Sequence, residues 1–271
     1  MLISGSIGVI ILNKDDNNII LLSDEHSNDI YCNNFSNSKF ISDYLFENSK
    51  YNTVLLEEIP RDGFSLEELF PNTKHTQQLK NLYLDDKTDI IGIDIRPYLI
   101  PFSFETLNIN KDNKNTLMKN YIKLVDEFIS KNGDLYNNKF KLINKLENSI
   151  PEIKNHFQII KRKYNNFKDK LDLELPIEIY YNNHIELLYD FNEICDSIME
   201  LYTILLALNN KTTIIHTGLY HSSNMVSLLV NLYEYRIKYN YGTNKYPPVN
   251  EEKITSCIYI PDNFNNFGFK N

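Results

Sequence analysis

The sequence predicts a mixed α/β fold, in which a mostly parallel central sheet carries helices on both faces and a helical insertion. Three observations support this prediction. Apolar runs of strand length recur along the chain, charged or polar residues follow them, and stretches with helical periodicity separate them. Near-continuous apolar strands that alternate with helices are typical of parallel sheets buried on both faces.

The expected strands begin at the N-terminus. The run Ile3 to Leu12 has strand composition and is expected to pair with the next run as a hairpin through Asn13 to Asn17. The later runs have the length and β-branched composition of buried strands. The expected strands after the first are residues 18–23, 52–56, 89–95 and 211–216, with a last one at 254–260.

Helical periodicity fills the intervals between the strands. Ser65 to Glu68 reads as a capping box that opens a short helix. A lysine-rich stretch from 136 to 171 is also helical in period and is interrupted at Pro151. We expect one domain over residues 1–271 with a helical insertion or cap at about 115–172. The other expected helices are residues 74–84, 117–130, 185–208 and 225–235.

Composition excludes several classes of protein. The 271 residues include 28 basic and 36 acidic side chains, a net charge of −8, which argues against a nucleic-acid partner. No apolar run reaches the ~18 residues that a membrane span requires. The N-terminus lacks the basic region of a signal peptide, so it reads as a first strand. We therefore expect a cytoplasmic protein.

The three cysteines are Cys32, Cys195 and Cys257. They are widely spaced and odd in number, a pattern that favours neither a disulfide framework nor a zinc site. The sequence thus predicts free thiols in a reducing compartment.

Ionisable residues gather where the predicted strands end. Because the carboxyl ends of parallel strands converge on one crevice, these side chains are expected to form one polar site. Single carboxylates or histidines at strand ends are more often structural, but here the pattern repeats over successive strands. The residues concerned are Asp24, Glu25 and His26 after the first run of the sheet, Glu57 and Glu58, Asp94 and Arg96, and His216 and His221.

His221 and Arg96 carry the sharpest expectations. His221 precedes Ser222, Ser223 and Asn224, which are good N-caps for the next helix, so its imidazole is expected near a positive helix terminus and neutral. Neutral imidazole acts as a general base or a metal ligand. Asp94 and Arg96 lie two residues apart on an expected strand and would share a face. Arg96 would anchor a carboxylate or an oxyanion; a capping histidine and a structural Asp–Arg pair are the alternatives.

Four short motifs resemble the superfamily that joins erythromycin-esterase-like, ChaN-like and TraB/Tiki proteins, and also uncharacterised proteins of large DNA viruses. Ser23 stands where the first motif of the family has glycine. The motifs are Ser23-Asp24-Glu25-His26, Glu57 within Leu55-Leu56-Glu57-Glu58, Gly92-Ile93-Asp94-Ile95-Arg96, and Gly218-Leu219-Tyr220-His221.

This resemblance implies an α/β sheet with a polar site at its rim. His26, Glu57 and His221 would be ligands of a divalent ion (Mn, Co, Zn or Fe) or acid–base groups, and Arg96 would stabilise negative charge that develops on the substrate. The substrate would be a small molecule or a peptide. For a viral chain, the expected location would be the host cytoplasm or the virion. The members of the superfamily include metal-dependent peptidases, lactone esterases and haem-binding proteins. The resemblance therefore indicates which residues form the site more closely than which reaction they catalyse.

Three functions compete on these residues. The first is a hydrolase of an amide or ester bond that activates water, with a metal ion or with histidine alone, with Asp94 among the candidate catalytic residues. The second is a metallophosphoesterase, which Asp24-x-His26 and Asn183-His184 faintly resemble. The third is a binding or host-interaction protein with a degenerate site, which the serine at position 23 favours. No P-loop, GxGxxG, HExxH or GxSxG motif is present, which argues against kinases, nucleotide-dependent dehydrogenases, zincins and α/β-hydrolases.

Overall fold

A computed structural model describes residues 1–25, 32, 38–60, 74–84, 90–103, 107, 111–131, 150–248 and 254–261. The chain divides into two compact units. The sheet unit comprises residues 1–94 and 206–271, and the helical unit comprises residues 95–205. The insertion expected at about 115–172 falls within the helical unit.

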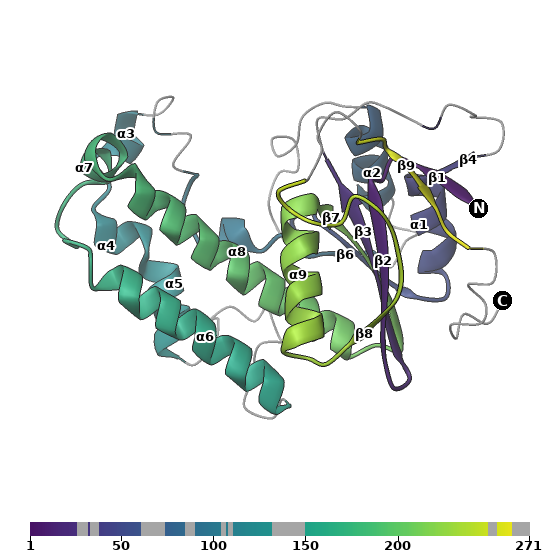
Figure 1. The fold of residues 1–271 in the computed structure, drawn as a ribbon. Helices are drawn as coiled ribbons and strands as arrows, with labels where there is room; N and C mark the ends of the chain where they lie inside the picture. Colours follow the sequence, from purple (N-terminus) through teal and green to yellow (C-terminus); the bar gives the residue numbers. More distant parts are fainter. Residues whose placement is uncertain are drawn as a thin grey trace. The chain divides into compact units, whose positions relative to one another are not determined.

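A six-stranded mixed sheet forms the centre of the sheet unit (Figure 1). Its order is β6-β5-β7-β3-β2-β8. The first four of these strands run parallel, and β2 and β8 are antiparallel to their neighbours, which confirms the predicted mixed, mostly parallel sheet. The strands are β2 (Gly8–Lys14), β3 (Asn17–Asp24), β5 (Thr53–Leu56), β6 (Ile91–Gly92), β7 (Thr212–Gly218) and β8 (Arg236–Gly242).

Helices cover both faces of this sheet (Figure 1). On one face, α1 (Ile41–Ser49) and α2 (Lys74–Leu84) pack on alternate strand residues such as Ile20 and Leu22. On the other face, α9 (Leu219–Asn231) contacts β3 and β7. Neighbouring residues on a strand point to opposite faces, so a strand buried on both sides must be apolar throughout. This requirement explains the unbroken apolar run of β3.

A second, three-stranded sheet joins the two ends of the described chain. It consists of β4 (Ser38–Phe40), β1 (Leu2–Ser4) and β9 (Cys257–Tyr259), with β1 in the middle. The N-terminal run therefore contributes two strands, because β1 leaves the hairpin of β2 and β3 and pairs elsewhere. The last strand lies where the sequence predicts it.

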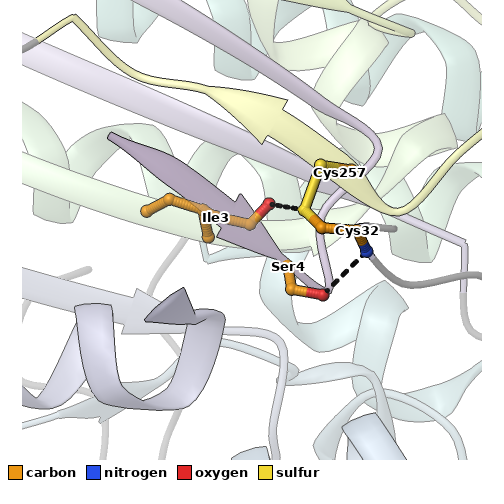
Figure 2. The surroundings of a disulfide bond; sticks show 4 residues. All are labelled: Ile3, Ser4, Cys32 and Cys257. Carbon is orange, nitrogen blue, oxygen red and sulfur yellow. Dashed lines mark hydrogen bonds between the residues drawn. A yellow bond between two sulfur atoms is a disulfide. The ribbon is translucent and has the colours of Figure 1, made fainter. Parts of the chain in front are cut away.

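A disulfide between Cys32 and Cys257 fastens this small sheet (Figure 2). The Cys32 amide donates a hydrogen bond to the Ser4 hydroxyl at 3.3 Å, and the Cys32 sulfur lies 3.6 Å from the Ile3 carbonyl oxygen. The prediction of three free thiols was therefore wrong, since only Cys195 is free and it is buried. Pairing across 225 residues leaves no local spacing pattern to find. The reducing compartment inferred from unpaired cysteines loses its basis.

The helical unit is built from short helices around a long one. Aromatic rings fill its core: the Phe191 ring stacks on the Phe167 ring with their centroids 5.4 Å apart, and the Tyr121 ring lies 5.4 Å from the Phe191 ring. Pro151 begins α6, as its fixed φ allows, and does not interrupt a helix. The elements are η3 (Arg96–Tyr98), α3 (Lys111–Lys114), α4 (Met118–Tyr121), α5 (Lys123–Ser130), α6 (Pro151–Lys168), α7 (Ile177–Asn183) and α8 (Ile185–Leu208), whose last three residues belong to the sheet unit.

Among the described residues, no helix combines the length and the apolar composition that crossing a bilayer requires. The predicted capping box at Ser65 to Glu68 lies outside the described residues.

Candidate functional site

Three neighbouring strands end at the same edge of the six-stranded sheet. Register places Asp24 of β3 beside Gly218 of β7, and Leu56 of β5 beside His216 of β7. The residues that follow these positions meet there because the strands are parallel. The structure thus brings Glu57 and His221 together as expected, whereas His26 lies outside the described residues.

Glu57 is the acidic residue that faces the α9 side of this edge. Its backbone N–H continues the ladder by donating to the His216 carbonyl at 3.1 Å. One carboxylate oxygen, Oε2, accepts a hydrogen bond from the Gly218 N–H at 2.7 Å, and the other, Oε1, lies 3.5 Å from His221 Nε2. The sequence left the choice between Glu57 and Glu58 open, and register makes Glu57 the partner of His221.

His221 lies within the first turn of α9 and not before the helix. The N-cap is Gly218, so Ser222 to Asn224 are helical residues, and their expected role as N-caps was wrong. Glycine lacks a capping side chain, and the N–H of this N-cap residue donates to the Glu57 carboxylate. A carboxylate at a helix N-terminus also has a favourable interaction with the helix dipole.

The Glu57–His221 pair is almost fully enclosed by protein. The side chain of Glu57 is 6% exposed and that of His221 is 7% exposed. Interactions between charges strengthen in such surroundings, because little water screens them. Burial of two ionisable groups side by side, at the end of a parallel strand, is typical of functional sites.

His216 lies on the other face of the sheet from α9. Its cross-strand neighbours Leu22 and Leu56 belong to the core under α1 and α2, and paired residues share a face. The next residue, Thr217, points the opposite way and its hydroxyl meets that of Ser222 on α9 at 2.8 Å. The structure therefore separates His216 from His221.

Asp94 and Arg96 do not share a strand face. The strand β6 ends at Gly92, and Arg96 begins the 3₁₀ helix η3. Asp94 is buried in the sheet unit, where its N–H donates to the Glu58 carbonyl at 3.0 Å. The expectation failed because the β6 ladder ends at Gly92, although apolar residues continue to Ile95, and the chain then enters η3.

Arg96 pairs with Asp196 of α8 within the helical unit. Its Nη1 donates to Asp196 Oδ1 at 3.0 Å, and both side chains are mostly buried. The structural Asp–Arg pair considered from the sequence therefore exists with a different aspartate. A separation of 100 residues explains why no local pattern revealed Asp196.

Ser23 has a structural partner that the sequence did not reveal. It is fully buried, and its hydroxyl donates to Asn244 Oδ1 at 3.1 Å. Gly8 lies opposite Ser23 in the β2–β3 pair. A Cβ at Gly8 would collide with the Thr243 carbonyl and the Asn244 side chain, so the glycine makes room for this stretch of chain.

A metal ion would have two ligands within reach in the described part of the chain. There, no three His, Cys, Asp or Glu side chains cluster closely enough to hold an ion. Glu57 Oε1 and His221 Nε2 are 3.5 Å apart. Two ligand atoms of one tetrahedral ion, each at about 2.1 Å from it, would be about 3.4 Å apart. The pair therefore fits two positions of such an ion, and the third ligand expected, His26, lies outside the described residues.

Comparisons with known proteins reveal no relative. No family model matches the sequence, and no curated protein or solved structure matches it. The superfamily resemblance consequently remains a prediction from four short motifs.

Proposed function

We propose that the chain is a hydrolase of an ester or amide bond, with Glu57 and His221 as its acid–base pair. The observation that carries this proposal is the buried contact of 3.5 Å between Glu57 Oε1 and His221 Nε2. The Gly218 N–H holds the other carboxylate oxygen at 2.7 Å, so the carboxylate is fixed in place before any substrate arrives. Such preorganisation is what a catalytic carboxylate needs in order to orient a histidine.

In the metal-free form of the reaction, His221 removes a proton from water as the water oxygen attacks the substrate carbonyl carbon. With Nε2 turned toward Glu57, Nδ1 is the nitrogen that takes this proton. The Glu57 carboxylate stabilises the imidazolium that forms. His221 then returns the proton to the leaving alcohol or amine as its bond to carbon breaks, and a carboxylic acid is the second product. General base catalysis of this kind contributes about 10²–10⁴-fold to the rate.

In the metal-dependent form, Glu57, His221 and His26 would hold a divalent ion (Mn, Co, Zn or Fe). A bound ion supplies a water whose pKa is lowered toward ~7. The carboxylate of Glu57 would keep its hydrogen bond with Gly218 through Oε2 and would hold the ion through its other oxygen. Arg96 and Asp94 enter the proposal through the resemblance alone.

A degenerate binding protein on the same fold is the alternative. From the sequence, its support was the serine in place of glycine at position 23. Because the Ser23 hydroxyl is bonded to Asn244, the serine has a structural explanation that does not require loss of activity. The metallophosphoesterase gains no support, because Asn183 and His184 end a helix of the helical unit.

A hydrolysis assay with matched histidine variants tests the proposal. The purified chain is assayed on phenyl acetate, ethyl acetate and a dipeptide amide, beside His221→Ala and His184→Ala. The side chain of His184 is 54% exposed in the helical unit, so this variant controls for loss of a histidine as such. We expect His221→Ala to lose about 10²–10⁴-fold in turnover and His184→Ala to retain it. No turnover on any substrate would favour the binding protein, whereas equal turnover in both variants would show that hydrolysis does not depend on His221.

Elemental mass spectrometry of protein purified without chelator separates the two forms of the reaction. About one Mn, Co, Zn or Fe per chain that disappears in His221→Ala supports the metal-dependent form, with haem excluded by the absorption spectrum. Hydrolysis without bound metal supports the metal-free form. Two ions per chain would instead favour a phosphoesterase.

A further inference from the structure

Two tyrosines continue outward from the buried His221. The Tyr220 ring lies 5.2 Å from the His221 ring at 75°, and the Tyr246 ring lies 5.3 Å from the Tyr220 ring at 89°. Both contacts are edge-to-face, which is a preferred geometry for aromatic pairs. His221 is buried, Tyr220 is half-buried and Tyr246 is 51% exposed. The three rings therefore lead from the acid–base pair to the surface of the sheet unit.

The chain that carries Tyr246 is fastened at several points. We call residues 243–246 the tyrosine strap. The Thr243 N–H donates to the Ile7 carbonyl at 2.8 Å, and the Tyr246 N–H donates to the Ser223 hydroxyl of α9 at 3.1 Å. Between them, the Asn244 amide group accepts from Ser23 and donates to the Tyr241 carbonyl at 2.8 Å. Hydrogen bonds to β3, β8 and α9 thus fix the position of the strap.

A large exposed aromatic ring is ordinary on a protein surface. Tyr246 differs because its backbone is fixed to the helix that carries His221, and because its ring meets the neighbour of that histidine. Ser23 and Gly8 both accommodate the strap, one through its hydroxyl and the other through its missing side chain. Several otherwise unexplained residues therefore contribute to one result, which is an exposed aromatic surface beside the acid–base pair.

We infer that Tyr220 and Tyr246 bind a flat aromatic group of the substrate, so that the preferred substrates are aryl or benzyl esters or amides. This inference rests on the proposed function. A planar ring contacts tyrosine rings through stacking or edge-to-face packing, which a flexible alkyl group does not match. Ligand sites commonly combine such apolar and aromatic contacts with a few fixed polar groups. Here the fixed polar groups are Glu57 and His221.

Binding can be measured without turnover, because the chain has no tryptophan. The variant Tyr246→Trp introduces a single fluorescent reporter, and Tyr51→Trp is its matched control. Tyr51 is 75% exposed and lies just before β5, at the opposite end of that strand from Glu57. Titration with 4-nitrobenzyl alcohol should quench Tyr246→Trp saturably, whereas collisional quenching of Tyr51→Trp should rise linearly. Equal, non-saturating curves in both variants would overturn the inference.

Kinetics supply a second readout that a merely structural tyrosine would not move. In Tyr246→Ala, KM for phenyl acetate should rise about three- to tenfold with little change in kcat, and the kinetics on ethyl acetate should stay the same. Tyr246→Phe should restore the KM for phenyl acetate. An equal loss on both esters would assign Tyr246 a structural role and overturn the inference.

The two readouts distinguish failure of the inference from failure of the proposed function. Saturable binding without hydrolysis of any ester would refute the hydrolase and leave the aromatic site standing. Hydrolysis with neither saturable binding nor a preference for aryl esters would refute the aromatic site and leave the proposed hydrolase standing.

Discussion

The two units bury their ionisable side chains in different ways. In the described part of the sheet unit, four carboxylates are buried, and they lie at or just after strand ends: Asp24, Glu57, Glu58 and Asp94. In the described part of the helical unit, one carboxylate, Glu200, is equally buried. Other acidic residues there form ion pairs at the surface, as Glu174 does with Lys119.

This difference indicates where the molecule accepts an energetic cost. Burying a charge is unfavourable unless partners compensate for it. The helical unit fills its interior with aromatic rings and keeps most of its charges at the surface, apart from Glu200 and the Arg96–Asp196 pair. The sheet unit places its charges at the edge where parallel sheets of other proteins commonly bind ligands. The comparison therefore favours the sheet unit as the location of the proposed chemistry.

The largest expected effect on stability concerns the disulfide, which belongs to the sheet unit alone. Cys32 and Cys257 close a loop of 225 residues. Loss of a native disulfide typically costs about 2–5 kcal/mol, and the chain-entropy model places so long a loop at the upper end of this range. The double variant Cys32→Ser/Cys257→Ser should lower the free energy of unfolding by that amount in a denaturant titration. Thiol alkylation of the denatured wild type should modify one cysteine before reduction and all three after it.

Cys195→Ala is the control for this experiment, because Cys195 is the free cysteine and lies in the helical unit. Hydrogen exchange should accelerate in β1 and β9 of the double variant and not in α6. Three alkylated thiols before reduction would contradict the disulfide.

A pH effect of comparable size is expected in the helical unit. Burial of His156 lowers its pKa to about 4, with a further contribution from Lys163, against 6.5 for the free side chain. The unfolded chain thus binds more protons than the folded chain between these values. Stability should fall as the pH drops from about 6.5 to about 4, by roughly 3 kcal/mol.

Denaturant titrations across this pH range check the effect. His156→Leu cannot titrate at that position and should lose this part of the pH dependence, whereas His184→Leu, which replaces an exposed histidine, should keep it. If the free energy of unfolding depends on pH with the same slope in both variants, carboxylates alone cause the acid sensitivity.

The smallest effect is expected at the surface of the helical unit. Lys119 Nζ lies 2.7 Å from Glu174 Oε2, but the two side chains are 45% and 70% exposed. Water and salt screen such pairs, which usually contribute less than about 1 kcal/mol. Lys119→Ala should therefore change the free energy of unfolding by no more than this amount, and added salt should reduce the change. A larger loss would break the contrast between the two units.

Features set by local periodicity could be predicted from the sequence. The helices at 74–84 and 185–208 and the hairpin of β2 and β3 follow from spacing and turn residues alone. The contact between Glu57 and His221 could be predicted as well, because the carboxyl ends of parallel strands lie at the same edge of the sheet. Each of these features depends on residues close in sequence or on a simple rule of topology.

Features set by distant partners could not be predicted. The Cys32–Cys257 bond, the Arg96–Asp196 pair and the hydrogen bond from Ser23 to Asn244 all join residues at least 100 positions apart. The first turn of α9 was missed because Gly218 has no capping side chain, and its acceptor comes from Glu57 on another strand. The strand at Asp94 was overestimated because apolar residues continue after the ladder ends.

Turnover and unfolding of Glu57→Gln, followed in the same preparation, distinguish a catalytic Glu57–His221 pair from a structural one. Glutamine keeps an oxygen that can accept from the Gly218 N–H but removes the charge beside His221. If the pair is catalytic, hydrolysis should fall by about 10²-fold or more while the free energy of unfolding changes by less than about 2 kcal/mol. Unchanged hydrolysis together with a loss of several kcal/mol would show that the pair holds the fold together, and would contradict the account.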